Sequence, residues 1–194
     1  MKTVYLTERD NFLYYGRHIL TADALLLDWS NSGFSFKFKG TGFHLVFDEY
    51  KADQPAYIRV DVDREKKVFG WSGTTARYCV SDGKEHVIID DLKNDEHTVR
   101  VLRITEGEEK LYVKGVELYG EILPPPLESV RRIEVLGDSI TCGYGVRGDQ
   151  DTTVFRTCDE DSTAAWAFLV AENLGGRPPQ PVRFRQGYCT QLRR

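Results

Sequence analysis

The chain has few of the features that mark membrane proteins or secretory precursors. No run of 18 apolar residues occurs in its 194 residues, so we expect no membrane-spanning helix. Near the N-terminus the charged run Glu8-Arg9-Asp10 lies where a secretory signal would need an unbroken apolar core, so we expect no such signal. The hydrophobic fraction of 41% and the charged fraction of 29% are typical of a soluble globular protein.

Cysteine is also scarce. Cys79, Cys142, Cys158 and Cys189 form no CxxC pair and no His/Cys ligand spacing. The usual zinc motifs and a dense disulfide framework are therefore not indicated. We expect free thiols, no bound metal and no cofactor.

Basic residues are not in excess, because 26 Lys and Arg stand against 30 Asp and Glu for a net charge of −4. Residues 176–194 hold five arginines and no acidic residue, so every acidic side chain lies before that segment. Nucleic-acid-binding proteins instead gather basic and aromatic residues on one folded face. We expect no nucleic-acid partner, and the composition does not indicate an oligomeric state.

Apolar and polar residues alternate between residues 34 and 119, a pattern typical of half-buried strands. Residues 34–38 and 43–47 predict a hairpin across the turn Gly40-Thr41-Gly42. Further strands are expected at 57–62, 85–89, 98–104 and 111–119, separated by turn sequences. We predict an all-β sandwich over residues 1–123, with these side chains in its core: Phe34, Phe36, Phe38, Val60, Val62, Val99 and Val101.

The pattern changes after Pro124-Pro125-Pro126, so we expect a linker at 124–131. An apolar strand at 133–136, a glycine-rich loop and an amphipathic helix from about Ser162 to Leu174 follow. Acidic residues 159–161 favour the start of this helix, and Ser162 can cap it. Trp166 and Val170 share one helix face with Leu174, and we expect that face to pack. Strand, loop and helix over 132–175 predict the start of a parallel α/β domain.

Ser139 follows this strand directly, in the sequence Gly137-Asp138-Ser139. Open α/β sheets place their ligands at the carboxyl ends of parallel strands. Gly137 allows a sharp turn, Asp138 can bond the backbone of that turn, and Gly143 and Gly145 would leave the loop open to a substrate. The Ser139 hydroxyl could then attack a carbonyl carbon. A bare Gly-Asp-Ser tripeptide is more often a simple turn.

The longer sequence Gly-Asp-Ser-Ile-Thr-x-Gly-x-Gly after an apolar strand resembles the first block of the SGNH, or GDSL, hydrolases. Tyr15-Gly16-Arg17, the turns at 32–34 and 38–42, the strand at 97–101 and the segment 132–145 together resemble carbohydrate esterase family two. The likeness covers roughly residues 12–175. It implies a jelly-roll-like sandwich before a flavodoxin-like α/β SGNH domain, and members that are often secreted or periplasmic.

This resemblance also implies an activity, namely removal of acetyl groups from plant polysaccharides such as xylan or glucomannan. Ser139 would be the nucleophile and an oxyanion donor, and Asp138 would support its loop. Gly143, Tyr144 and Gly145 are candidate substrate-binding residues. The partner would be an acetylated polysaccharide or oligosaccharide.

Three other elements of the family cannot be assigned: the second-block glycine, the third-block asparagine and the catalytic histidine. All four histidines precede Ser139 and lie in the predicted sandwich: His18, His44, His86 and His97. Asn173 is the only later asparagine, and it lies at the predicted helix end. We therefore expect this copy to be inactive.

The composition changes again after Gly175, because residues 176–194 contain three of the seven prolines. A disordered basic tail is one interpretation. The other is a frameshift near residue 176, since suitable codons for 182–193, read one nucleotide later, spell Ser-Gly-Ser-Gly-Lys and Gly-Ile-Val-Arg-Asn-Tyr. On that hypothesis the chain is a C-terminally truncated family member with an aberrant tail.

Two further functions compete with the esterase. In a carbohydrate-binding accessory sandwich without catalysis, Trp29, Tyr50, Trp71 and Tyr78 would stack on sugar rings. Each of these residues taken alone is more often a core residue. The third function is a protein-interaction module.

Overall fold

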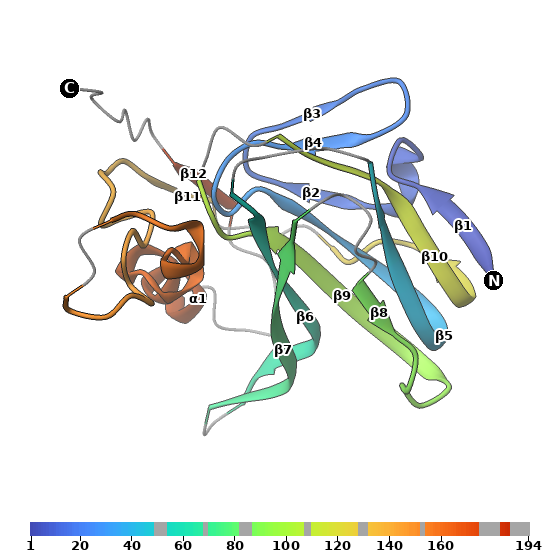
Figure 1. The fold of residues 1–194 in the computed structure, drawn as a ribbon. Helices are drawn as coiled ribbons and strands as arrows, with labels where there is room; N and C mark the ends of the chain where they lie inside the picture. The colour runs from blue at the N-terminus through green and yellow to red at the C-terminus, as the bar shows by residue number, and fades with distance from the viewer. Residues whose placement is uncertain are drawn as a thin grey trace.

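A computed structural model describes residues 1–48, 54–67, 70–81, 87–106, 110–127, 132–151, 154–174 and 183–186. Most of them form an antiparallel β sandwich (Figure 1). The described strands of its sheet are β1 Lys2–Tyr5, β2 Leu13–Tyr15, β3 His18–Leu20, β4 Leu25–Leu27, β5 Gly33–Phe47, β6 Ala56–Lys66, β7 Trp71–Val80, β8 Val87–Ile89, β9 Asp95–Arg103 and β10 Leu111–Leu123. A short 3₁₀ helix, η1 at Arg9–Asn11, precedes β2.

The long strand β5 joins the two halves of the sheet. Its first part pairs with β9, which leads on to β6 and β7. Its second part pairs with β8 on one edge and with β10 on the other, and β10 leads on to β4 and β3. The sheet therefore curls around one core, with β5 running through both of its halves.

The predicted hairpin between Phe38 and Phe43 is wrong, because β5 is one continuous strand of 15 residues. Gly40 pairs with Gly120 and Gly42 with Tyr119, so Thr41 is an extra residue opposite β10. Such a bulge shifts the side-chain alternation by one position. Even-numbered phenylalanines before the bulge and odd-numbered apolar residues after it consequently face the same core.

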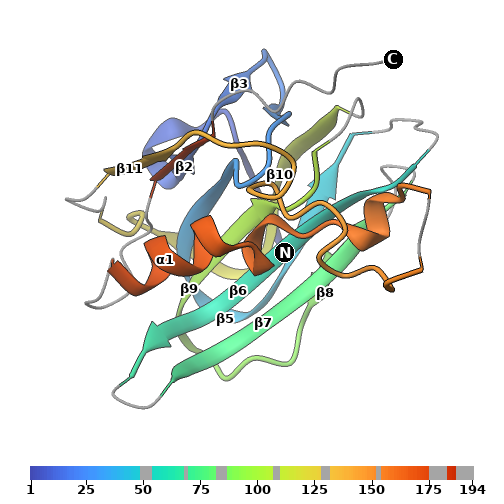
Figure 2. The same cartoon turned by 90° about the vertical axis from the view of Figure 1, so that its left-hand side faces the viewer.

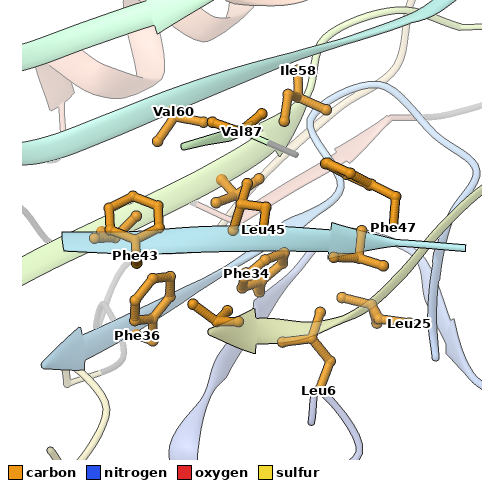
Figure 3. Packing of buried hydrophobic residues seen from close by; sticks show 14 of the residues in the cluster. Leu6, Leu25, Phe34, Phe36, Phe43, Leu45, Phe47, Ile58, Val60 and Val87 are labelled. Atoms are coloured by element: carbon orange, nitrogen blue, oxygen red, sulfur yellow. The ribbon is translucent and has the colours of Figure 1, made fainter. Parts of the chain in front are cut away.

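That core is a cluster of aromatic and branched aliphatic side chains from both halves of the sheet (Figure 3). Phe36 contacts Phe43 edge to face at 5.4 Å across the bulge. The prediction of the core is confirmed, because all seven residues named from the sequence are buried: Phe34, Phe36, Phe38, Val60, Val62, Val99 and Val101.

The other predicted strands lie within β6, β9 and β10, and β8 covers the described part of 85–89. The sequence analysis missed β1 to β4 and β7. β7 carries mostly half-buried or exposed residues, so it lacks an apolar alternation. β10 ends at Leu123, directly before the three prolines. The predicted domain boundaries stay predictions.

After the prolines the order is β11 Arg132–Val135, η2 Thr157–Asp159, η3 Ser162–Ala164, α1 Trp166–Leu174 and β12 Arg183–Gln186. β11 and β12 pair in parallel, as an α/β segment requires. Four residues of the predicted aberrant tail thus form a strand, and the rest of 176–194 lies outside the described residues. Figure 2 shows α1 lying across the face of β9, β6 and β7. None of the described helices is long and apolar enough to cross a membrane.

The predicted packing face of the helix is wrong. Trp166 and Val170 are 52% and 48% exposed, whereas Ala167, Phe168 and Ala171 are buried. Small alanines let the helix approach the sheet, and Phe168 fills the space between two arginines of the sheet. The start of the helix also differs, because Ser162 opens a 3₁₀ turn that the Asp161 side chain caps through the Thr163 amide.

The glycine at the β5 bulge generates the first prediction. A Cβ at Gly40 would lie 2.1 Å from the Tyr119 carbonyl oxygen, which is backbone and cannot rotate away. We expect Gly40→Val to lower the free energy of unfolding by about 3 kcal/mol. Urea denaturation measures this loss, and Lys39→Ala on the exposed face of the same strand is the control. Equal stability of the two variants would contradict the tight approach of β10.

Candidate functional site

Ser139 lies in the turn that follows β11, four residues beyond the last residue of the strand. It is half-buried, while its neighbours Asp138 and Ile140 are exposed. The Asp138 carbonyl accepts hydrogen bonds from the amides of Thr141 and Cys142, at 3.0 and 3.2 Å. The chain therefore forms a tight turn at Ser139. This turn is part of the loop at the carboxyl end of β11.

Two features of the sequence fix this turn. The Asp138 carboxylate accepts a hydrogen bond from the Ile140 amide at 3.1 Å, the contact expected of a residue that supports the loop. A Cβ at Gly137 would lie 2.0 Å from the Thr141 hydroxyl oxygen. Thr141 is buried, so a larger residue at position 137 would displace it.

The far side of the loop is tied to the segment before α1. Gly143 has a φ of +80°, and a Cβ there would lie 2.2 Å from the Asp161 carbonyl oxygen. The Asp161 amide donates to the Gly143 carbonyl at 3.1 Å. Arg147 donates to the Asp161 carboxylate at 2.8 Å. Close packing against Asp161 thus explains the glycine at 143, and its predicted role in substrate binding stays a prediction.

The backbone amide of Tyr144 donates a hydrogen bond to the Ser139 carbonyl at 2.9 Å, so Tyr144 belongs to the same turn. Its ring stacks on Phe155 with centroids 4.3 Å apart and planes 12° apart. Tyr144 is 43% exposed. Gly145 has a φ of +72° and open space around it. Tyr144 and Gly145 therefore lie on the solvent side of the loop.

An apolar cluster holds this segment on the sandwich. Phe168 and two alanines of α1 pack with Tyr15, Leu102 and Ile104 of the sandwich. Ile133 and Val135 of β11 border the same cluster. The Ser162 amide donates to the Ile104 carbonyl at 2.9 Å, and the Ser162 hydroxyl donates to Asn31 at 2.9 Å. The strand before Ser139 and the helix after it are thereby packed on one face of the sheet.

An ion cluster under α1 adds charge pairing to this interface. Asp61 is 2% exposed and accepts from Arg59 at 2.8 Å and from Arg100 at 2.6 Å. Arg100 also donates to Glu172 of the helix at 2.8 Å, and Arg64 donates to Glu172 at 3.3 Å. Two carboxylates and three guanidinium groups from β6, β9 and α1 thus form one cluster, and two of the guanidinium groups, those of Arg59 and Arg100, lie against the Phe168 ring.

The charges of this cluster stabilise one another. Burial alone would raise the pKa of Asp61, but the positive charges of Arg100 and Arg59 outweigh it and lower that pKa. Burial would lower the pKa of Arg100, but Asp61 and Glu172 raise it. Burial lowers the pKa of Arg64. Asp61 is therefore ionised at neutral pH, and the ion pairs of Glu172 with Arg100 and Arg64 bind α1 to the sheet.

Arg77 of β7 holds the turn before the helix. Its Nη2 donates to the carbonyls of Cys158 and Glu160, at 3.0 and 3.1 Å. Its guanidinium lies 3.8 Å from the ring centroid of Tyr57. Burial raises the pKa of Tyr57 to about 12, so this ring stays neutral. Arg77 therefore satisfies carbonyls at the end of η2 that would otherwise lack a partner.

The described histidines have partners in the sandwich. His97 of β9 lies 2.7 Å from Asp63 through Nδ1 and 2.7 Å from the Lys93 carbonyl through Nε2. His44 pairs with Glu117 at 3.7 Å, and His18 Nδ1 lies 3.1 Å from the Gly16 carbonyl. His86 lies outside the described residues. No base for Ser139 is found among the three that are described.

The aromatic residues proposed for sugar stacking are largely engaged. The guanidinium of Arg64 lies 4.2 Å from the Trp71 ring centroid, and that of Arg17 lies 5.1 Å from Trp29. Tyr78 is half-buried against the core, and Tyr50 lies outside the described residues. Arginine thus occupies one face of each of these two tryptophan rings.

Thiols and acidic groups do not gather into a metal site in the described ranges, where no group of three or more potential ligands occurs. Cys79, Cys142 and Cys158 are free, and Cys142 is buried. Cys189 lies outside these ranges.

Sequence reasoning missed the residues that hold the Ser139 segment in place. Arg59 and Asp61 alternate with the buried residues of β6, so they look like the solvent face of an edge strand. Glu172, which pairs with Arg64 and Arg100 of the same cluster, follows more than seventy positions after Arg100. The available signal was Glu172, a charged residue on the face of α1 that packs on the sheet. Because the opposite face of the helix is equally apolar, the sequence did not show which face packs.

The sequence pattern of one known family fits the sandwich. The family described as Carbohydrate esterase 2 N-terminal matches residues 14–126, more than half of the chain. The chain belongs to this family. A stretch of 55 residues is 40% identical to the cellulase/esterase CelE of Acetivibrio thermocellus, covering 28% of this chain and 7% of CelE.

Solved structures of family-two carbohydrate esterases share this fold. The enzyme from Cellvibrio japonicus superposes with a TM-score of 0.77 at 19% identity, covering 95% of this chain and 51% of that one. The acetyl xylan esterase Est2A from Butyrivibrio proteoclasticus gives 0.78 at 17%, covering 96% and 48%. The Clostridium thermocellum enzyme, solved in complex with cellohexaose, gives 0.74 at 23%, covering 90% and 50%. The chain thus spans about half the length of these relatives.

The ion cluster generates the second prediction. Glu172→Gln keeps the shape of the side chain but removes the charge that pairs with Arg100 and Arg64. We expect the free energy of unfolding to fall by about 2 kcal/mol, and amide hydrogen exchange in α1 to accelerate more than exchange in β5. Glu121→Gln, on an exposed part of β10, is the control. Unchanged exchange in α1 would show that the cluster does not hold the helix.

His97 generates a prediction on pH. Burial would lower its pKa, but the hydrogen bonds to Asp63 and to the Lys93 carbonyl outweigh it and raise the pKa above 6.5. This contribution to stability is complete below pH 6.5 and is lost as the pH rises through the raised pKa. Chemical denaturation from pH 6 to 9 should therefore show a decline that Asp63→Asn reduces. An equal decline in Asp63→Asn would contradict this assignment.

Proposed function

We propose that this chain provides the sandwich and the nucleophile-bearing segment of a carbohydrate acetyl esterase of the SGNH hydrolase type. The substrate class is an acetylated polysaccharide or oligosaccharide, such as xylan or glucomannan. The observation that carries the proposal is the position of Ser139, in a tight turn at the carboxyl end of β11, which pairs in parallel with β12. Open α/β sheets place reactive groups at this position.

The proposed chemistry follows from the groups around Ser139. The Ser139 oxygen attacks the acetyl carbonyl carbon while a base takes its proton, and the Ser139 amide donates to the developing oxyanion. The C–O bond to the sugar then breaks, and the sugar alcohol leaves with a proton. Water hydrolyses the acetyl-serine to acetate. Asp138 supports the loop, Tyr144 borders the substrate, and no cofactor takes part.

The sequence of residues 1–194 contains no histidine after Ser139 to act as the base. One helix on a two-stranded parallel sheet also leaves much apolar surface open. The outward face of α1 carries four large apolar residues, each about half exposed: Trp166, Leu169, Val170 and Leu174. In the proposal, further elements of the α/β domain cover this face and supply the base and the remaining oxyanion donors.

Activity of residues 1–194 alone is the fourth prediction. A serine without its base loses on the order of a millionfold in turnover. We expect no release of acetate from acetylated xylan above background, and the same result for Ser139→Ala. Turnover that disappears in Ser139→Ala would require a base within these residues, and His18, His44, His86 and His97 would be replaced in turn to find it.

A chimera tests the positive part of the proposal. Residues 1–174 are joined to the part of the Butyrivibrio proteoclasticus acetyl xylan esterase that this chain does not cover. We expect acetate release that Ser139→Ala abolishes, with cooperative unfolding as the measure of folding in both versions. A chimera that unfolds cooperatively but releases no acetate would reject Ser139 as the nucleophile.

A further inference from the structure

A small cavity lies on the sandwich near the N-terminus. Its volume is about 270 Å³, and it is lined by Arg9 of η1, Tyr14 of β2, and His18 and Leu20 of β3. Leu13 and Tyr15, the neighbours of Tyr14, contact the cluster under α1. Side chains alternate between the two faces of a strand. The cavity is therefore on the other side of β2 from the segment that carries Ser139.

The aromatic wall of the cavity is rigid. Tyr14 donates its hydroxyl to the Leu6 carbonyl at 2.6 Å, and its ring stacks on His18 with centroids 5.1 Å apart. His18 Nδ1 lies 3.1 Å from the Gly16 carbonyl, which only a protonated Nδ1 can satisfy. The contacts of Nδ1 and the ring stacking fix the orientation of His18. Its Nε2 remains for a ligand.

The charge in the cavity comes from Arg9. Its side chain makes no hydrogen bond or ion pair with any residue in the described ranges. The two carboxylate oxygens of the preceding residue, Glu8, accept from the Tyr5 amide and from Asn11, and not from Arg9. Burial raises the pKa of Tyr14 to about 12, and the positive charge of Arg9 opposes that rise. The guanidinium charge is thus felt inside the cavity.

We propose that this cavity binds the carboxylate of a uronic acid residue in a polysaccharide. The guanidinium of Arg9 presents paired N–H donors that match a carboxylate, and His18 Nε2, the acceptor nitrogen when Nδ1 carries the proton, accepts a hydrogen bond from an adjacent sugar hydroxyl. Leu20 contacts the apolar face of the sugar ring. The volume of about 270 Å³ is just below the range of ligand pockets, which measure about 300–1,000 Å³, and suits one sugar ring. The sugar part rests on the proposed function, whereas the carboxylate follows from Arg9 alone.

Calorimetric titration of residues 1–194 with glucuronate, glucose and acetate tests the proposal. We expect glucuronate to bind at least tenfold more tightly than glucose or acetate. Arg9→Gln should weaken glucuronate binding at least tenfold, and Arg9→Lys should weaken it less, because lysine keeps the charge without the paired donors. His18→Gln should weaken it severalfold. Lys39→Gln, which removes an exposed cation from β5, should leave it unchanged.

Three outcomes would overturn the proposal. If glucose bound as tightly as glucuronate, the cavity would not recognise the carboxylate. If acetate bound as tightly, it would not recognise the sugar. If Arg9→Gln and Lys39→Gln weakened binding equally, the binding would reflect only non-specific charge. Thermal unfolding of each variant checks that it is folded, and the exposed position of Arg9 makes its replacement compatible with folding. The readout is independent of Ser139, so failure here is distinct from failure of the esterase proposal.

Discussion

The arrangement of this protein depends on the contact between α1 and the face of β6 and β9. A strand that carries Arg59 and Asp61 on its outer face would expose them in an isolated sandwich. Here Arg100 pairs with Asp61 and also with Glu172 of α1, and the buried Phe168 ring packs against Arg59 and Arg100. Removing one partner of such a cluster leaves a buried charge unpaired, which costs several kcal/mol. The cluster therefore specifies where the helix lies, and the helix in turn positions the turn at Asp161.

Asp161 connects this interface to the candidate nucleophile. Its amide bonds Gly143, its carboxylate accepts from Arg147 and caps η3, and its backbone packs against the glycine of the Ser139 loop. The position of Ser139 thus rests on residues of both the sandwich and the α/β segment. The two parts of this chain therefore depend on each other for the position of the Ser139 loop.

Much of the sandwich could be predicted from the sequence, because alternation identifies half-buried strands. Phe34, Val60 and Val99 needed only that pattern. The bulge at Thr41 could not be predicted, since Gly40 and Gly42 are equally compatible with a turn, and only the partner strand β10 decides between the two. The prediction of the packing face of α1 was wrong for a similar reason. Trp166 and Val170 are more apolar than Ala167 and Ala171, but close approach to a charged sheet favours the small residues. The turn at Ser139 was visible from its sequence motif, whereas its anchoring through Asp161 depends on contacts distant in sequence.

The hydrogen bonds from Arg77 to the carbonyls before α1 restrict the motion of the sandwich relative to the segment that follows it. A proline-rich connection between two units often acts as a hinge that lets domains close around a ligand. In this protein, rotation about that connection would pull Arg77 from its carbonyls and separate Glu172 from Arg100. Buried charges would then lose their partners. The sandwich and the segment after it therefore move as one body. The loop that carries Ser139 is consequently held in place against the sandwich, with the ring of Tyr144 stacked on Phe155.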